Sequence, residues 1–331
     1  MKLKLFERNE SVRVLPHSSD AFFEHLIDYA GLFPPTQLPL QIAITNYASY
    51  ITRKGAWKIG PFVHLANTLN ELDPYVSLFS KEHPLSISAL GRKGQSERDS
   101  FELLEEDLKA ILSFRERHGE RVSVDFLELP IPSLNVTSQY ISELHLYLTK
   151  YNLFCYCELP INEEEINWED RLKDAIASIA KQNRIAPSLI GAKLRTGGIR
   201  ADLIPSVEIV ASFIHSCKTH KVPSKFTAGL HHPIRMYRDE VQTEMHGYLN
   251  VFIAGMMAHT HDLEKETIID ILETQESSGI SFEQDKIIWN GLEVTTDKII
   301  ELRRSYLRSY GSCSFEGPMN EFKTLNVLER G

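Results

Sequence analysis

Apolar, strand-like runs alternate with segments of helical length along most of this chain, and this alternation constrains its fold more than any other feature. Seven candidate strands lie between residues 25 and 235, in the runs HLIDYAGLF, WKIGPFVHLA, HPLSISALG, VSVDFLELPI, LFCYCELPI, LIGAKLRTGG and SKFTAGLHHP. Amphipathic or charged segments separate them, and several of these begin with Ser, Thr or Asn, as helix N-caps do. Strict strand–helix alternation predicts a parallel sheet.

The repeat length favours a closed barrel. FLELPIP and YCELPIN share the sequence Glu-Leu-Pro-Ile, and their glutamates at 128 and 158 are 30 residues apart (158 − 128 = 30), about one strand–helix unit. Seven such units and one more would form a (β/α)8 barrel of the TIM type, and 331 residues accommodate this barrel with a C-terminal extension. An open doubly wound sheet is the alternative, but no G-x-G-x-x-G motif follows the first strand.

The C-terminal third decides how the barrel closes. We expect YLNVFIAGMMA (248–258) to form the seventh helix, LRSYGSCSFEGP the eighth strand and PMNEFKTLNVL the closing helix. Between them, DLEKETIIDILETQ is expected to be helical, and FEQDKIIWNGLEVTT, with Asn-Gly at its centre, to form a β-hairpin. The chain is therefore predicted to be a single barrel domain over residues 1–331, with residues 277–298 as a small hairpin appendage.

Composition narrows the class of partner. The net charge is −9 and the pI is near 5.8, which disfavours a general binder of nucleic acid or anionic membrane because phosphate binding requires a basic face. A small anionic substrate in a local basic pocket remains compatible with this charge. No apolar run is long enough for a membrane span, and we see no signal peptide. The four cysteines form no C-x-x-C motif, so we expect them to be reduced in a cytoplasmic protein. We also expect a possible homodimer, because dimers are the commonest assembly.

Polar residues gather at the C-terminal ends of the predicted strands, which is the catalytic end of such barrels. In IGAKLRTGG, Lys193 and Arg195 share one strand face, and Glu128 and Glu158 end the fourth and fifth strands. Lys193 and Glu158 are therefore candidate catalytic residues. A structural interpretation is also open, in which both cations pair with the two glutamates in a polar layer of the barrel.

Among the local motifs, AGLHHP points most specifically to a functional site, because adjacent histidines at a strand end are rarely needed for packing. Alternation predicts that His231 points inward and His232 toward a neighbouring loop. Imidazole serves as an acid, a base or a metal ligand near neutral pH, so His231 is a candidate catalytic residue. Cys313 in YGSCSF would also lie at the barrel mouth, but a nucleophilic thiol needs a nearby base, and the sequence shows none.

Further residues are candidates for binding the substrate. The turn after the sixth strand exposes backbone N–H groups near a helix start, an arrangement that can hold a phosphate or carboxylate. Asp28 ends the first strand, and His246 forms an i, i+4 pair with Asn250 on an expected helix that could face the mouth. The predicted substrate-binding set is Arg195, Thr196, Gly197, Gly198, Asp28 and His246.

Two resemblances accompany these motifs. DYAGLFPP, GAKLRTGG, AGLHHP and GSCSF together resemble a family of bacterial hypothetical proteins, and this resemblance implies no activity. Locally, K-x-x-T-G from Lys193 to Gly197 is similar to the lysine strand of Schiff-base aldolases such as deoxyribose-phosphate aldolase. That resemblance implies that Lys193 forms a carbinolamine and an imine with a substrate carbonyl. Arg195 departs from the pattern, and Lys225 is placed at the start of the seventh strand. A cation next to Lys193 is expected to depress the pKa of its amine.

We therefore predict a barrel lyase or aldolase-type enzyme that acts on a small anionic carbonyl compound. Lys193 would be the imine-forming or substrate-binding residue, with His231 or Glu158 moving protons. One alternative is a metal-dependent lyase or isomerase that uses a divalent Mn, Zn or Fe ion. Its mixed oxygen and nitrogen ligands would be Glu128, Glu158, His231 and His232. The other alternative is a non-catalytic protein that binds a small ligand on a barrel scaffold.

Overall fold

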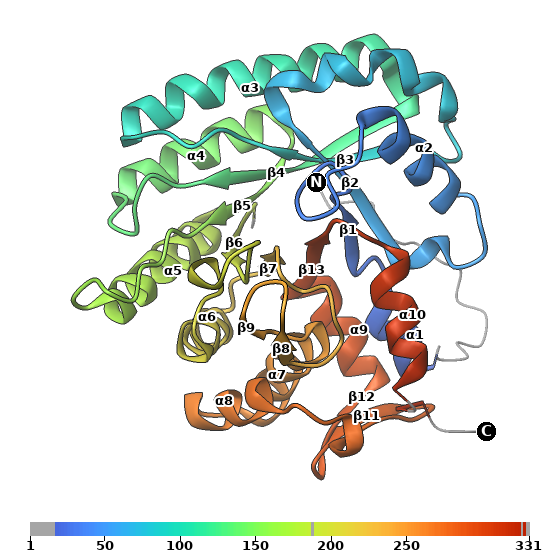
Figure 1. The fold of residues 1–331 in the computed structure, drawn as a ribbon. Helices are drawn as coiled ribbons and strands as arrows, with labels where there is room; N and C mark the ends of the chain where they lie inside the picture. The colour runs from blue at the N-terminus through green and yellow to red at the C-terminus, as the bar shows by residue number, and fades with distance from the viewer. Residues whose placement is uncertain (1–16, 187–188, 326, 329–331) are drawn as a thin grey trace.

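Eight parallel strands close into a barrel, as the alternation predicts (Figure 1). The computed structural model describes residues 17–186, 189–325 and 327–328. The barrel strands are β1 (Ile27–Tyr29), β2 (Ile59–Leu65), β3 (Leu85–Leu90), β4 (Val122–Pro130), β5 (Phe154–Glu158), β6 (Ile190–Arg195), β7 (Ser224–Thr227) and β13 (Leu307–Ser312). Their order around the barrel is β1-β13-β7-β6-β5-β4-β3-β2. All the predicted strands are confirmed, including the eighth in LRSYGSCSFEGP.

Helices surround the barrel and connect its strands (Figure 1). They are α1 (Ser18–Phe23), α2 (Leu40–Tyr50), α3 (Glu97–His118), α4 (Ser138–Tyr151), α5 (Trp168–Ile185), α6 (Val207–His220), α7 (Tyr248–His261), α8 (Lys265–Glu273), α9 (Thr296–Ser305) and α10 (Glu316–Thr324). Thr137 and Ser206 accept backbone N–H groups in the first turns of α4 and α6, which is the N-cap role that the sequence indicates. The seventh helix lies where YLNVFIAGMMA predicts it.

One connecting segment is a different kind of helix. NTLNELDPYVSLFS lies mostly in η2 (Ala66–Leu78), a 3-10 helix with a non-helical residue at Thr68 and a proline at position 74. Proline has no backbone N–H and clashes with the preceding turn, so a regular α-helix is not maintained here. The shorter 3-10 turns are η1 (Ala56–Lys58), η3 (Gly119–Arg121), η4 (Ala201–Leu203) and η5 (Ser277–Gly279).

Small antiparallel sheets lie outside the barrel. The predicted hairpin is present as β11 (Lys286–Trp289) and β12 (Leu292–Thr295), and its turn residues Asn290 and Gly291 have the positive φ angles that a tight hairpin turn requires. The structure adds a third strand, β10 (Ile280–Phe282), beside β11. A second sheet pairs β8 (Met236–Arg238) with β9 (Thr243–Met245) in the segment that follows β7.

Arg303 fixes the N-terminal ends of β1 and β13. Its buried guanidinium donates from Nε to the carbonyl of Phe22 and from Nη2 to that of Glu24, each at 3.0 Å. Nη1 donates to the carbonyls of Leu307 and Arg308 at the start of β13. Because a guanidinium carries five N–H donors in a fixed plane, one side chain can hold both segments together. The two strands that close the barrel are thus joined at their base as well as by their ladder.

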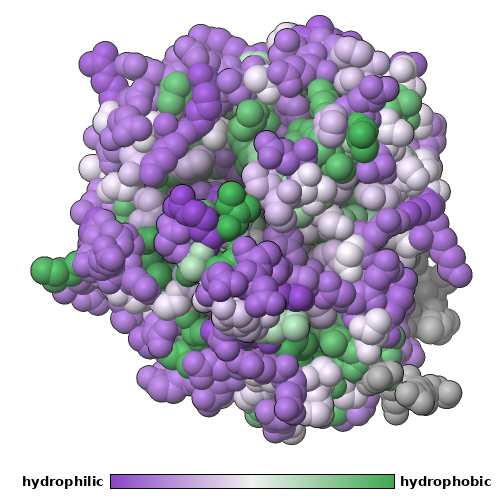
Figure 2. Space-filling view, in the orientation of Figure 1, coloured by the Kyte–Doolittle hydropathy of each residue, from purple (hydrophilic) through white to green (hydrophobic). Residues whose placement is uncertain are grey.

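Hydrophilic and hydrophobic residues are divided between the surface seen in Figure 2 and the interior. Figure 2 shows hydrophilic residues over most of the visible face, with smaller hydrophobic patches between them. Apolar side chains instead form one continuous core, which includes Ile87, Leu127 and Phe226 from the barrel strands. Within the described ranges, no helix has the length and apolarity needed to cross a membrane.

Candidate functional site

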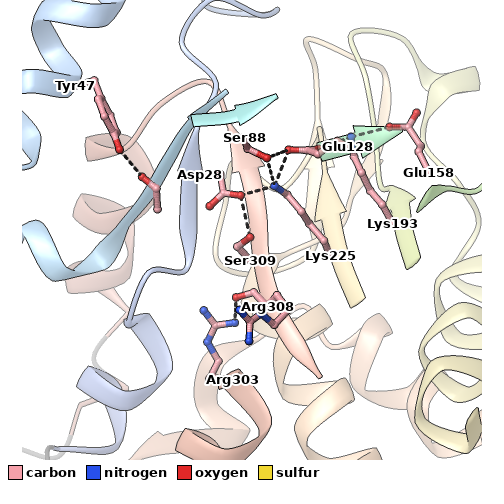
Figure 3. A network of polar contacts seen from close by, with 11 residues as sticks. Asp28, Tyr47, Ser88, Glu128, Glu158, Lys193, Lys225, Arg303, Arg308 and Ser309 are labelled. Carbon is pink, nitrogen blue, oxygen red and sulfur yellow. Dashed lines mark hydrogen bonds and ion pairs between the residues drawn. The ribbon is translucent and has the colours of Figure 1, made fainter. Parts of the chain in front are cut away.

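Two lysines share one carboxylate inside the barrel (Figure 3). Lys193 Nζ lies 2.5 Å from Glu128 Oε2, and Lys225 Nζ lies 2.6 Å from Glu128 Oε1. Lys193 is 3% exposed, Lys225 1% and Glu128 2%. Charged side chains are almost never buried to this degree unless they are paired, so these three groups depend on one another.

Two further carboxylates extend the cluster. Lys193 Nζ lies 2.7 Å from Glu158 Oε2, whose side chain is 23% exposed, and Lys225 Nζ contacts Asp28 Oδ2. The result is a chain of alternating charges, Glu158, Lys193, Glu128, Lys225 and Asp28, with one end open to solvent (Figure 3). We call these five residues the charged layer.

Serine hydroxyls complete the hydrogen bonding of the charged layer. Ser88 Oγ donates to Glu128 at 2.6 Å, and Ser309 Oγ donates to Asp28 at 2.9 Å. Among the described residues, none forms a hydrogen bond with the buried Oδ1 atom of Asp28. Gly60 faces this oxygen, because a Cβ at that position would lie only 2.0 Å from it. The sequence thus provides space for Asp28 with a residue that has no side chain.

The register of the parallel strands brings the charged layer together. Glu158 of β5 pairs with Lys193 of β6, and Lys193 pairs with Lys225 of β7. Side chains of paired residues in a parallel sheet lie on the same face. Three of the five charges are therefore neighbours around the barrel wall.

Burial and the neighbouring charges have opposing effects on the pKa of each group in the charged layer, and which effect is larger differs between groups. Burial alone would raise the pKa of Glu128, but the two ammonium groups outweigh burial and lower this pKa to about 2. Burial opposes the charge of Lys193, but Glu128 and Glu158 outweigh it and raise the pKa of this amine. At Asp28 burial dominates over the attraction of Lys225, so the pKa of Asp28 is raised. The predicted depression of the Lys193 pKa is wrong in direction, because carboxylates and not Arg195 surround the amine.

Lys225 belongs to the charged layer, but the sequence analysis does not include it among the candidate site residues. It was placed at the start of its strand and therefore outside the site. β7 is only four residues long, from Ser224 to Thr227, and its first residues lie level with the middle of β6. The available signal is alternation, because Lys225 lies an even number of positions before His231, which the sequence analysis predicts to point inward.

In the predicted anion-binding turn, Arg195 is exposed, whereas Thr196 and Gly197 pack against the segment that follows β7. Arg195 is exposed at the end of β6, and the described part of the chain gives it no ion-pair partner. Thr196 is buried, and its hydroxyl donates to the carbonyl of Ala228 at 2.6 Å. Gly197 packs against Gly229, since a Cβ on either would lie 2.7 Å from the other's Cα. Thr196 and Gly197 therefore join the ends of β6 and β7, a contact in which the exposed Arg195 takes no part.

The two adjacent histidines contact different partners. His231 Nδ1 lies 3.7 Å from Cys313 Sγ, and His232 Nδ1 lies 2.7 Å from Glu321 in α10. Strand alternation does not determine their directions, because β7 ends at Thr227 and both Ala228 and Gly229 have positive φ. Burial lowers the pKa of His231 to about 4, with a smaller contribution from His232. An imidazole nitrogen thus lies close to Cys313, a proximity that the sequence does not show.

His246 holds loops together. It precedes α7 and therefore does not share a helix with Asn250, contrary to the prediction. Its Nε2 contacts the carbonyl of Pro205 at 2.8 Å, and the side chain is buried. Asn250 accepts the N–H of Arg235 and donates to the carbonyl of Ile271. Arg235 Nη1 lies 3.4 Å from the other ring nitrogen of His246, Nδ1, so both nitrogens contact the protein itself.

The predicted metal ligands are not brought together. Glu128 and Glu158 contact Lys193, whereas the histidines contact Cys313 and Glu321. Within the ranges that the structure describes, no group of three or more His, Cys, Asp or Glu side chains is arranged to hold a metal ion. The two glutamates neutralise ammonium groups and do not form part of such a set.

Comparison with known proteins gives a distant structural likeness. No protein-family model and no curated protein matches the sequence. Among solved structures, the chain is similar to a deoxyribose phosphate aldolase from Aeropyrum pernix, described as having a unique tetrameric structure. The TM-score is 0.41 at 12% identity, over 65% of this chain and 81% of that chain. This likeness is too distant to transfer an activity, a residue role or an assembly.

Proposed function

We propose that this chain is an aldolase- or lyase-type enzyme that acts on a small anionic carbonyl compound, with Lys193 as the imine-forming residue. The observation that carries the proposal is the position of the Lys193 amine between Glu128 at 2.5 Å and Glu158 at 2.7 Å. The amine lies inside the barrel, toward the C-terminal end of β6, where barrel enzymes place their catalytic groups.

The resting ammonium must lose a proton before its nitrogen can attack a carbonyl carbon. Transfer of that proton to a contacting carboxylate gives a neutral amine and a carboxylic acid, with no change in net charge. Glu158 is the better acceptor, because its side chain is partly exposed whereas Glu128 also neutralises Lys225. Glu158 can then return the proton to the carbinolamine oxygen, which leaves as water when the imine forms.

An anionic group on the substrate has a binding site nearby. Arg195 lies two residues after Lys193 on β6, is exposed, and has no carboxylate partner among the described residues. The backbone of Gly198 follows in the same segment. A free guanidinium favours a carboxylate or phosphate, which it can bind through two parallel hydrogen bonds. This arrangement supports a substrate with one carbonyl and one anionic group.

Borohydride trapping tests the proposal directly. The protein is incubated with small aldehydes and keto acids, with and without a phosphate group, then reduced with sodium borohydride and digested for mass spectrometry. We expect the mass of the reduced substrate to be added to the peptide that contains Lys193. Lys193→Arg keeps the positive charge but cannot form this adduct, and is the control for modification elsewhere.

Two results would contradict the proposal. One is a folded protein in which no carbonyl compound of the panel modifies Lys193. The other is an adduct that is equally abundant in Lys193→Arg, which would assign the reaction to a different amine. Lys225→Arg distinguishes the two buried lysines, because it leaves Lys193 available for trapping.

A further inference from the structure

Cys313, His231 and Thr36 meet at the mouth of the barrel, in the segments that follow three neighbouring strands. Cys313 follows β13, His231 follows β7 and Thr36 follows β1, and these strands are adjacent in the order β1-β13-β7. Thr36 Oγ1 donates to Cys313 Sγ at 3.0 Å, and His231 Nδ1 lies 3.7 Å from the same sulfur. The thiol thus has a hydrogen-bond donor and a potential base.

These contacts favour a reactive thiol in two ways. A hydroxyl that donates to sulfur stabilises the thiolate, which is the nucleophilic form. The His231 ring is largely buried, and burial lowers its pKa to about 4, so the imidazole is neutral at pH 7 and offers the Nδ1 lone pair to the thiol, although the same burial makes it a weaker base than a free imidazole. His232 and Arg238 also lower this pKa, while Glu240 and Glu321 raise it.

The other cysteines have different surroundings. Cys155 and Cys157 lie within β5, and Cys217 lies within α6. Burial raises the pKa of the Cys155 and Cys217 thiols. Cys313 is also buried, at 6% exposed, but it lies just beyond the end of β13, on the side of the barrel where enzymes of this fold bind their substrates. A difference in reactivity between these thiols is therefore expected.

We propose that Cys313 and His231 form a second nucleophilic site, at which the thiol adds reversibly to the carbonyl carbon of a small aldehyde. His231 Nδ1, in the tautomer that carries hydrogen on Nε2, takes the thiol proton as Sγ bonds to the carbonyl carbon. The C=O π pair moves to oxygen, which receives the proton from the imidazolium. The product is a hemithioacetal, and neither an oxidant nor a leaving group is required. The choice of an aldehyde rests on the proposed function, whereas the activated thiol does not.

Alkylation by iodoacetamide, followed residue by residue with mass spectrometry, measures the reactivity of the thiol. We expect Cys313 to be modified about tenfold faster than Cys217 or more, and His231→Gln to slow this reaction by about tenfold. His83→Gln is the control and should leave the rate unchanged, because His83 is exposed and precedes the N-terminal end of β3, away from the strand ends that carry Cys313 and His231. Thr36→Val removes the hydrogen bond to sulfur and should also slow alkylation, which provides a second test if His231→Gln does not fold.

Glycolaldehyde then tests the carbonyl adduct, with ethylene glycol as the control that lacks a carbonyl. We expect glycolaldehyde alone to protect Cys313, equally well in the wild type and in Lys193→Arg. An alkylation rate that is unaffected by both His231→Gln and Thr36→Val, or an absence of protection by the aldehyde, would overturn the proposal. Protection of Cys313 by glycolaldehyde, combined with no borohydride trapping at Lys193 by any carbonyl compound of the panel, would instead reject the proposed function and support the thiol site.

Discussion

At the scale of single residues, the buried lysines differ in how well their partners can be hydrated. Lys225 lies between Asp28 and Glu128, and both carboxylates are buried. Lys193 shares Glu128, but its second partner, Glu158, is partly exposed to water. Breaking a buried ion pair by removing one partner is strongly destabilising, because an uncompensated charge is left in the interior. We therefore expect substitutions at the two positions to have unequal effects on stability.

We expect Lys225→Met to lower the free energy of unfolding by about 3 to 5 kcal/mol, and Lys193→Met by less. Urea unfolding followed by circular dichroism measures both changes. Lys81→Met is the control, because Lys81 pairs with Glu120 on the surface, where such pairs contribute about 0 to 1 kcal/mol. A larger loss in Lys193→Met than in Lys225→Met would contradict this account of the charged layer.

The charged layer also shows what the sequence could reveal about single residues. Lys193, Glu128 and Glu158 were found from their places at strand ends, and the structural interpretation of Lys193 paired with both glutamates is present. Arg195 does not join them. Ser88 and Ser309 could not be predicted, because their contacts with Glu128 and Asp28 depend on the three-dimensional stagger of distant strands.

At the scale of elements, the period-two and helical patterns predicted every barrel strand, because each strand is a short apolar run between polar segments. The directions of residues beyond a strand end were not predictable in the same way. At Ala228 and Gly229 the backbone takes positive φ, so the alternation used to orient His231 no longer applies. His231 and Cys313 both lie in loops that follow strands, so their proximity produces no periodic pattern in the sequence.

The contact between the ends of β6 and β7 gives a prediction at this scale. A Cβ on Gly197 would lie 2.7 Å from Gly229 Cα, and backbone atoms cannot move aside as a side-chain end can. We expect Gly197→Ala to lower the free energy of unfolding by about 1 to 3 kcal/mol, the range for overpacking. In Gly91→Ala the nearest atom is Leu129 Cδ1 at 3.0 Å, so the loss should be smaller. Equal urea midpoints for the two variants would show that the turn can open.

At the scale of the whole molecule, the charged layer couples barrel stability to pH. Its members come from β1, β4, β5, β6 and β7, so their protonation affects strands on opposite sides of the barrel. The pKa of Glu128 is lowered to about 2, and its contribution is therefore present above its ordinary value of 4.5 and lost as pH falls from there toward 2. The raised pKa of Lys193 affects stability at alkaline pH. The contribution of the Lys193 ammonium to the free energy of unfolding is present below pH 10.5 and is lost at higher pH.

Asp28 has the opposite effect on stability at acidic pH. Burial raises its pKa, so the folded state binds a proton more readily than the unfolded state and is stabilised as the pH falls. The contribution of Glu128 is therefore isolated by comparing the wild type with Glu128→Gln. We expect the difference in unfolding free energy to be on the order of 3 kcal/mol between pH 5 and 9, and to shrink as pH falls below about 4.5. Urea unfolding at a series of pH values measures this difference. Glu102→Gln, which alters an exposed pair with Arg98, should differ little from the wild type throughout. A Glu128→Gln difference that stays constant down to pH 3 would mean that this carboxylate does not stabilise the barrel through its charge.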